Sequence, residues 1–244
     1  MDITGRFRVT LLDGFALWSE ERPEPRLTDV APGLQRLVAY LCLSGRPART
    51  AVAGQLWPEV SEEHAHASLR SAVWRLARIA PGLVEASKGA LRLAPGVSVD
   101  VHDLRSWCER VLQPQVPAAE VLWPDPALQG DLLPGWYDDW LLLEREQLRQ
   151  LRMHALEAVA TRLADVGHYG AAVQAAHLAL RADPLRETAH RTLVRLHLAE
   201  GNVADAVRAY RRFREMLHDE LGVLPTARMT QLFEQVDGAR LAAS

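Results

Sequence analysis

Arginine side chains recur at helical spacing along one short stretch of the chain. This stretch is the strongest candidate in the sequence for binding an anion. Arg70, Arg75 and Arg78 are accompanied there by Ser71 and Trp74. Guanidinium groups form paired hydrogen bonds with phosphate oxygens and with guanine edges, so this stripe predicts contact with nucleic acid. Arginines on a helix are more often only solvated charges, and the interpretation therefore depends on the elements that surround them.

The charge of the chain is distributed unevenly. The whole protein is mildly acidic, with a net charge of −3, which provides no long-range attraction for phosphate. Between His64 and Arg92, however, five basic residues stand against a single acidic one, Glu85. Residues 106–244 carry 15 basic and 19 acidic side chains. One segment is therefore electropositive within an otherwise acidic molecule.

Short strands and helices are predicted on both sides of the arginine stripe. Strand-like runs over residues 7–12 and 15–18 are separated by Asp13-Gly14, a strong hairpin signal. The stripe itself belongs to the last of three predicted helices, which are expected over residues 35–43, 50–57 and 61–80. Thr50 and Ser61 are residue types that cap helix N-termini, and we expect each to cap one of the last two helices.

The third predicted helix has one apolar and one polar face. Its apolar side chains recur every three or four residues and should face the core: they are Ala65, Leu69, Ala72, Val73, Leu76 and Ala80. Two short strands, 83–85 and 90–93, then flank a turn at Lys88-Gly89. This order is that of a winged helix-turn-helix, an α+β fold whose third helix enters the major groove of DNA while the hairpin reaches a neighbouring backbone or minor groove.

The second half of the chain carries a repeated helical pattern. Glycine, alanine and bulky positions recur 34 residues apart, which is the period of tetratricopeptide helix pairs. The first copy comprises Gly167, Tyr169, Ala172, Ala176, Ala179 and Pro184, and the second comprises Gly201, Val203, Ala206, Tyr210 and Phe213. Further helices are expected around residues 140–163 and 226–236. The pattern predicts an all-α tetratricopeptide-like array, whose concave surface is of the kind that binds proteins.

Three segments of the chain are similar to a known protein family. FRVTLLDGFALW and ASLRSAVWRLAR lie in the first half, and ADPLRETAHRTLVRLHLAEGNVADAVRAYRRFREMLHDELGVLP lies in the second. The first half resembles the OmpR-type winged-helix DNA-binding domain, and residues 6–236 as a whole resemble the Streptomyces antibiotic regulatory proteins. Those proteins join such a domain to a bacterial transcriptional activation domain. The resemblance implies that residues 1–104 bind DNA and that residues 105–244 form the activation domain.

Ten residues are predicted to contact DNA. The candidates for base recognition on the third helix are Arg70, Ser71, Trp74 and Arg75. The candidates for phosphate contact, which positions a domain without specifying sequence, are Arg49, Thr50, Arg78 and Lys88. His66 and Gly89 complete the predicted surface.

Several side chains also have a purely structural interpretation. Trp74 could pack against the hairpin or the first helix instead of touching DNA. His64 and His66 have the spacing of a metal-binding pair, but no third ligand lies nearby, which favours capping or phosphate contact. Asp138-Asp139 is expected to begin a helix. The core of the second half is expected to be anchored by three tryptophans, Trp123, Trp136 and Trp140.

The sequence lacks the motifs of common enzymes. It contains no P-loop, no G-x-G-x-x-G after a strand, no H-E-x-x-H and no G-x-S-x-G, so we expect no catalytic residues, no metal and no cofactor. Cys42 and Cys108 are isolated and suit buried free thiols in a reducing compartment. The longest apolar run, residues 37–43, is too short to span a bilayer, and no secretory leader is recognised, which predicts a cytoplasmic protein without a membrane partner.

Together these patterns predict a sequence-specific, DNA-binding transcriptional activator. The family resemblance implies binding to direct repeats near promoters, association as a dimer on DNA and recruitment of RNA polymerase holoenzyme, with a secondary-metabolite gene cluster as the expected target. Two other functions remain compatible with the residues: a helical-repeat adaptor that binds protein, and a repressor with the same DNA-binding surface. Titration with promoter DNA separates the adaptor from the two regulators.

Overall fold

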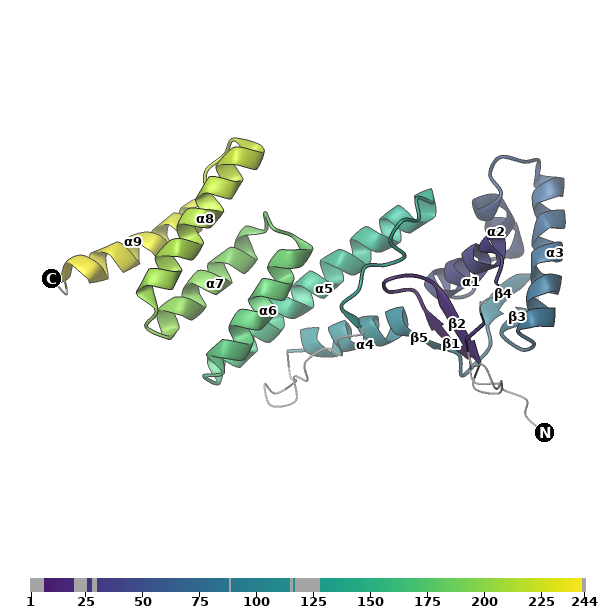
Figure 1. Ribbon diagram of the computed structural model, residues 1–244, viewed down its shortest axis with the longest axis horizontal. Helices are drawn as coiled ribbons and strands as arrows, with labels where there is room; N and C mark the ends of the chain where they lie inside the picture. The colour runs from purple at the N-terminus through teal and green to yellow at the C-terminus, as the bar shows by residue number, and fades with distance from the viewer. Residues whose placement is uncertain are drawn as a thin grey trace. The chain divides into compact units, whose positions relative to one another are not determined.

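The structure is a computed structural model that describes residues 7–19, 26–27, 30–87, 89–114, 116 and 128–242, the last eight of these by their backbone alone. The chain folds into two compact units. The first contains Met1–Ser106 and Pro124–Glu146, and the second contains Trp107–Trp123 and Gln147–Ser244. The first unit is an α+β winged helix-turn-helix and the second is an all-α tetratricopeptide-like domain (Figure 1).

A small mixed sheet begins the first unit. The strand β1 (Phe7–Thr10) lies in its centre, with β2 (Ala16–Ser19) antiparallel on one side and β5 (Ser98–Val99) parallel on the other. The hairpin predicted at Asp13-Gly14 is confirmed, and both turn residues have positive φ angles, of 59° and 130°. Aspartate and glycine tolerate this backbone region better than other residues do, which explains why the turn forms there.

Three helices and a second hairpin complete the winged helix (Figure 1). The helices are α1 (Pro32–Ser44), α2 (Arg49–Leu56) and α3 (Glu62–Ile79), and the hairpin strands are β3 (Val84–Ser87) and β4 (Ala90–Leu93). The apolar stripe predicted on α3 is buried as expected, except that Val73 is only partly covered. Ser61 caps α3, as predicted, by accepting a hydrogen bond from the backbone N–H of His64. The cap predicted at Thr50 is wrong: α2 begins at Arg49, so its N-cap is Ala48 and Thr50 lies inside the helix.

A buried carboxylate joins the sheet to the following helix. Asp100 is the first residue of α4 (Asp100–Leu112) and is 5% exposed. Its side chain accepts hydrogen bonds of 2.7–3.0 Å from the backbone N–H groups of Leu11, Leu12 and Val101. Burial raises the pKa of Asp100, and these three donors oppose that rise. One carboxylate therefore provides the hydrogen-bond acceptors for backbone N–H groups both just after β1 and in the first turn of α4.

Residues 131–140 pack against the winged helix. Leu133 donates its N–H to the carbonyl of Leu11 at 2.8 Å, and Asp13 donates to the carbonyl of Asp131 at 2.8 Å. Trp136 stacks on Phe15 with ring centroids 6.5 Å apart. A Cβ atom at nearby Gly130 would lie 2.4 Å from the Asp13 carboxylate, so any other residue there would require that carboxylate to move.

Trp140 extends the same contact by meeting Tyr40 edge-on, with ring centroids 5.2 Å apart. The prediction that Trp136 and Trp140 anchor the second half is therefore wrong, because both pack within the first unit; Trp123 lies outside the described residues. The prediction assigned both tryptophans to the second half because they follow residue 104, but residues 124–146 belong to the first compact unit.

Polar contacts reinforce this attachment. Arg36 pairs with Asp138, the residue directly before α5 (Asp139–Asp165), and Arg105 pairs with Glu144 at 2.7 Å. Arg145 donates to three carbonyl oxygens of the preceding loop, at distances of 2.8–3.1 Å. The start of α5 thus belongs structurally to the first unit.

The second unit consists of helices joined by tight turns. After α5 come α6 (Tyr169–Ala182), α7 (Glu187–Ala199), α8 (Val203–Leu221) and α9 (Ala227–Ala242). Gly167 and Gly201 have φ angles of 78° and 79° in the turns before α6 and α8, a backbone region that glycine adopts without strain. Ala172 and Ala206, at equivalent repeat positions, are almost fully buried. The small residues let neighbouring helices pack closely, as the repeat spacing predicted.

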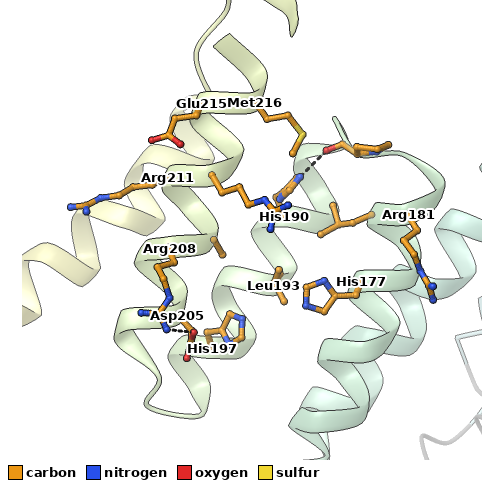
Figure 2. Close-up of a pocket in the computed structure, with 14 residues that line it drawn as sticks. His177, Arg181, His190, Leu193, His197, Asp205, Arg208, Arg211, Glu215 and Met216 are labelled. Atoms are coloured by element: carbon orange, nitrogen blue, oxygen red, sulfur yellow. Dashed lines mark hydrogen bonds and ion pairs between the residues drawn. The ribbon is translucent and has the colours of Figure 1, made fainter. Parts of the chain in front are cut away.

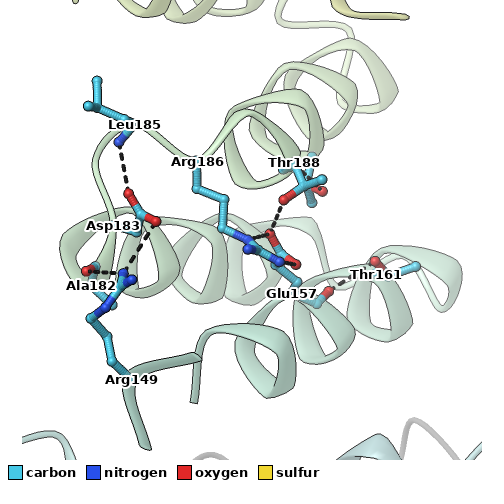
Figure 3. Close-up of polar contacts among 9 residues, drawn as sticks. Arg149, Glu157, Thr161, Ala182, Asp183, Leu185, Arg186 and Thr188 are labelled. Atoms are coloured by element: carbon cyan, nitrogen blue, oxygen red, sulfur yellow. Dashed lines mark hydrogen bonds and ion pairs between the residues drawn. The ribbon is translucent and has the colours of Figure 1, made fainter. Parts of the chain in front are cut away.

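A half-buried ion pair ties α5 to the beginning of α7 (Figure 3). Arg186 donates to both carboxylate oxygens of Glu157 at 2.7 and 3.0 Å, and Thr188 donates to one of them. Burial raises the pKa of Glu157, but the hydrogen bonds from Arg186 and Thr188 outweigh it and leave the pKa below its usual value. The folded state therefore binds the proton more weakly than the unfolded state does.

We expect Glu157→Gln to lower the free energy of unfolding by about 1–3 kcal/mol at pH 7 because it removes a charge-assisted contact. The stabilisation is present above the usual pKa of a glutamate and is lost as the pH falls through the lowered folded value. The difference between wild type and variant should shrink in acid, as measured by urea unfolding from pH 7 to pH 3. Glu220→Gln, on the exposed end of α8, is the control and should change little at any pH.

Both cysteines are buried free thiols, as predicted, and burial raises the pKa of Cys108 to about 12. Among the described helices, none combines the length and apolar character needed to cross a membrane.

Candidate nucleic-acid interface

The polar face of α3 is solvent-exposed along most of its length. Arg70, Ser71, Trp74, Arg75 and Arg78 are all exposed. These residues follow each other at intervals of one and three, so their side chains lie on one side of the helix. The opposite side of α3 is anchored in the core by Leu69 and Leu76, each 1% exposed. Because the buried stripe holds the helix in place, the five polar side chains form one continuous surface.

Trp74 occupies the centre of that surface and is 60% exposed. The guanidinium of Arg78 lies over its ring, 4.9 Å from the centroid. Of the two alternatives for Trp74, the described contacts do not favour packing against the hairpin or α1. A stacked guanidinium uses its face for the ring and keeps its N–H groups, which lie in its plane, available to an acceptor such as phosphate.

The hairpin and the start of α2 are joined by backbone contacts. Arg49 donates its N–H to the carbonyl of Gly89 at 2.8 Å, and Leu91 donates to the carbonyl of Pro47 at 3.1 Å. Ala48 and Ala90 form an isolated antiparallel bridge. Gly89 has a φ of 80°, which the turn requires. The structure therefore brings together two predicted contact segments that are 40 residues apart in the chain, at Arg49 and Gly89.

Other predicted positions are less accessible or less charged. The imidazole of His66 is 28% exposed and lies 3.7 Å from Glu62 on its own helix. The ring of His64 lies 2.7 Å from the hydroxyl of Ser61, in the capping role considered for it. On the hairpin, Arg92 is paired with Glu85 at 2.6 Å. This pair neutralises part of the positive charge counted from the sequence.

Two further basic residues belong to the hairpin or to the segment that pairs with it. Lys88 lies outside the described residues. Arg46 was not predicted; it is exposed and directly precedes Pro47, which pairs with β4. No sequence pattern marks Arg46, because the pairing that brings it to the hairpin joins segments far apart in the chain. Within the part of the chain that the structure describes, no three His, Cys, Asp or Glu side chains are placed to share a metal ion.

Comparison with known proteins relates residues 109–237 to a family of transcriptional activator domains and nearly the whole chain to two regulatory proteins. The family model for the bacterial transcriptional activator domain matches residues 109–237, more than half of the chain. Regulatory protein AfsR from Streptomyces coelicolor is 29% identical over 252 residues, and AfsR from Streptomyces griseus is 28% identical over 247 residues. These alignments cover 96% and 94% of this chain but 24% of each relative, so the chain spans about a quarter of their length.

A solved structure supports the fold over most of the chain. Mycobacterium tuberculosis EmbR, in complex with a low affinity phosphopeptide, superposes with a TM-score of 0.72. The match covers 95% of this chain and 65% of the EmbR chain at 20% sequence identity. At that identity the likeness concerns the fold alone. It agrees with a winged helix followed by a helical array.

Proposed function

Because the chain belongs to the bacterial transcriptional activator domain family and has the architecture of the Streptomyces antibiotic regulatory proteins, we propose that it is a sequence-specific, DNA-binding transcriptional activator. In this proposal α3 enters the major groove and the hairpin contacts the adjacent backbone. No enzymatic step is involved. The expected targets are the promoters of a biosynthetic gene cluster.

The observation that carries the proposal is the exposed face of α3. Arg70 and Arg75 present guanidinium groups from a helix whose other side is fixed in the core, and no ion pair occupies either group among the described residues. A rigid helix with unpaired arginines can make bidentate contacts to guanine edges without prior reorganisation. Four residues are proposed to bind phosphates and set the position of α3: Arg49, Thr50, Arg78 and Lys88.

The helical array has a separate role in the proposal. Copies of the protein bind neighbouring direct repeats, where they associate as a dimer, and the array contacts RNA polymerase holoenzyme. Support comes from the family assignment of residues 109–237 and from the acidic balance of residues 106–244, which suits a protein partner better than DNA.

Arg70→Ala tests the recognition face. We expect it to weaken binding to the target operator by about 1–3 kcal/mol, because a bidentate contact to guanine is lost. Binding to random DNA should weaken much less. Arg195→Ala, on an exposed position of α7, is the matched control and should leave both affinities unchanged in a gel-shift or fluorescence titration.

An equal loss on operator and random DNA would assign Arg70 to phosphate contact instead of base recognition. No measurable binding to promoter DNA by the wild-type chain would contradict the proposal and favour the adaptor.

Salt dependence tests the contribution of the hairpin. With roughly 4–6 phosphate contacts per protomer, log affinity should fall with log salt at a slope of about −4 to −5. Lys88→Ala should make this slope shallower by about one unit, because one counterion fewer is released, while operator preference is retained. An unchanged slope in this variant would remove Lys88 from the phosphate-binding set.

A further inference from the structure

A cavity of about 810 Å³ lies along α7, lined also by α6 and α8 (Figure 2). Each helix contributes side chains at helical spacing, so one face of each lines the same space. The lining residues include His177 and Arg181 from α6, His190 and Leu193 from α7, and Arg212 from α8. A volume of this size is typical of sites for organic ligands.

The cavity has apolar side chains beside its charged ones. Leu193, 5% exposed, lines it from α7, and Leu180, Ala209 and Met216 contribute further apolar surface. His190 is 7% exposed and stacks on Phe213 with ring centroids 4.2 Å apart. Its Nε2 atom lies 2.8 Å from the carbonyl oxygen of Pro184. A carbonyl only accepts, so Nε2 carries the proton and the imidazole is held in one orientation.

Basic groups outnumber acidic ones around this cavity. Four arginines line it against two carboxylates, those of Asp205 and Glu215. Asp205 is already paired with Arg208. Among the described residues, no carboxylate pairs with Arg181 or Arg212. The lining therefore has an excess of positive charge that nothing described in the chain neutralises.

The histidines report the same positive potential. Burial lowers the pKa of His177, and His197, Arg181 and Arg212 lower it further. Burial also lowers the pKa of His190, with Arg212 and His177 adding to the effect, while the Pro184 carbonyl and Asp183 oppose it. Arg212, which lines the cavity, thus lowers the pKa of histidines from both α6 and α7. An anion in this space would relieve the repulsion among these groups.

We propose that this cavity binds a small organic anion, with its apolar body against Leu193 and Met216 and its acidic group beside Arg181 and Arg212. The ligand class follows from the combination of a partly open apolar surface with uncompensated, solvent-exposed guanidinium groups at its rim, which bind carboxylate, phosphate or sulfonate oxygens in pairs. This site shares no residue with the proposed DNA-binding face, and the proposal does not depend on whether the chain activates transcription.

The test is a fluorescence titration of the full chain with 1-anilinonaphthalene-8-sulfonate, which has an apolar body and one anionic group. We expect saturable binding at one site. Arg181→Gln and Arg212→Gln should each weaken it about tenfold, because each removes a charge-assisted hydrogen bond. Arg214→Gln, on α8 but outside the cavity lining, is the matched control and should bind as wild type does. Circular dichroism confirms that each variant is folded.

Two further measurements separate the alternatives. The uncharged analogue N-phenyl-1-naphthylamine should bind much more weakly than the sulfonate, and NMR titration should show the pKa values of His177 and His190 rising when the sulfonate is bound. Equal binding of both compounds, or equal binding by all three arginine variants, would overturn the proposal. Displacement by a hexaglutamate peptide but not by naphthalene-1-sulfonate would overturn it in favour of an acidic peptide partner.

Discussion

Ala206→Glu should abolish transcriptional activation while operator binding is largely retained. Ala206 is 1% exposed on α8 and belongs to a buried cluster with Val194, Tyr210 and Phe213. A glutamate there must place its carboxylate among apolar side chains, which costs about 3–5 kcal/mol when no partner compensates it. Such a loss is a large part of the stability of an ordinary domain. The helical array should therefore unfold, while the winged helix keeps its own core.

Three assays measure this outcome. Circular dichroism should show loss of helix, gel-shift titration should show operator binding, and in vitro transcription with RNA polymerase should show no stimulation. Ala206→Ser, which adds one hydroxyl, is the control and should retain activation. If Ala206→Glu unfolds the array and still activates as wild type does, the polymerase contact lies in the winged helix and the proposed role of the array is wrong.

A point substitution is a sharper test here than truncation. A fragment that ends at residue 104 would lack Leu133, which hydrogen-bonds to Leu11, and Trp140, which packs on Tyr40. It would also lack the carboxylate of Asp138 that pairs with Arg36. Weak DNA binding by such a fragment would therefore reflect damage to the first unit, and its loss of activation could not be assigned to the array.

Asp100→Ala should destabilise the winged helix by about 3–5 kcal/mol, because it leaves three buried backbone N–H groups without an acceptor. The donors belong to Leu11, Leu12 and Val101, and each lies within 3.0 Å of the carboxylate. Operator affinity should fall as well, since α3 depends on the same unit for its position. Urea unfolding of the full chain, followed together with operator binding, measures both effects.

The graded control is Asp100→Asn. Asparagine keeps one carbonyl oxygen, so it can still accept from part of this donor set, but its NH₂ group replaces the second acceptor. Its cost should be smaller than that of alanine, about 1–3 kcal/mol. Equal stability of wild type and Asp100→Ala would show that the carboxylate does not hold β1 and α4 together.

Local chemistry in the sequence was sufficient for much of the fold and the candidate surface. The spacing of Leu69 and Leu76 predicted which side of α3 is buried, and thus which side exposes Arg70 and Arg75. Asp13-Gly14 marked a hairpin because both residues tolerate positive φ. The 34-residue recurrence marked the helical array. Each of these signals either involves residues close together in the chain or recurs at a fixed interval, so it can be recognised in a single sequence.

Contacts between distant segments were decided only in the tertiary structure. Trp136 and Trp140 are large apolar residues that could fill either core, and the sequence contains no signal that assigns them to the winged helix. Gly89 meets Arg49, and Asp100 meets Leu11, across 40 and 89 residues of chain. The cavity beside α7 likewise requires three helices to place His177, His190 and Arg212 together. Residue type sets what each side chain can do, but the summed packing of the whole chain selects its partner, because apolar burial is non-directional and many pairings satisfy the same local pattern.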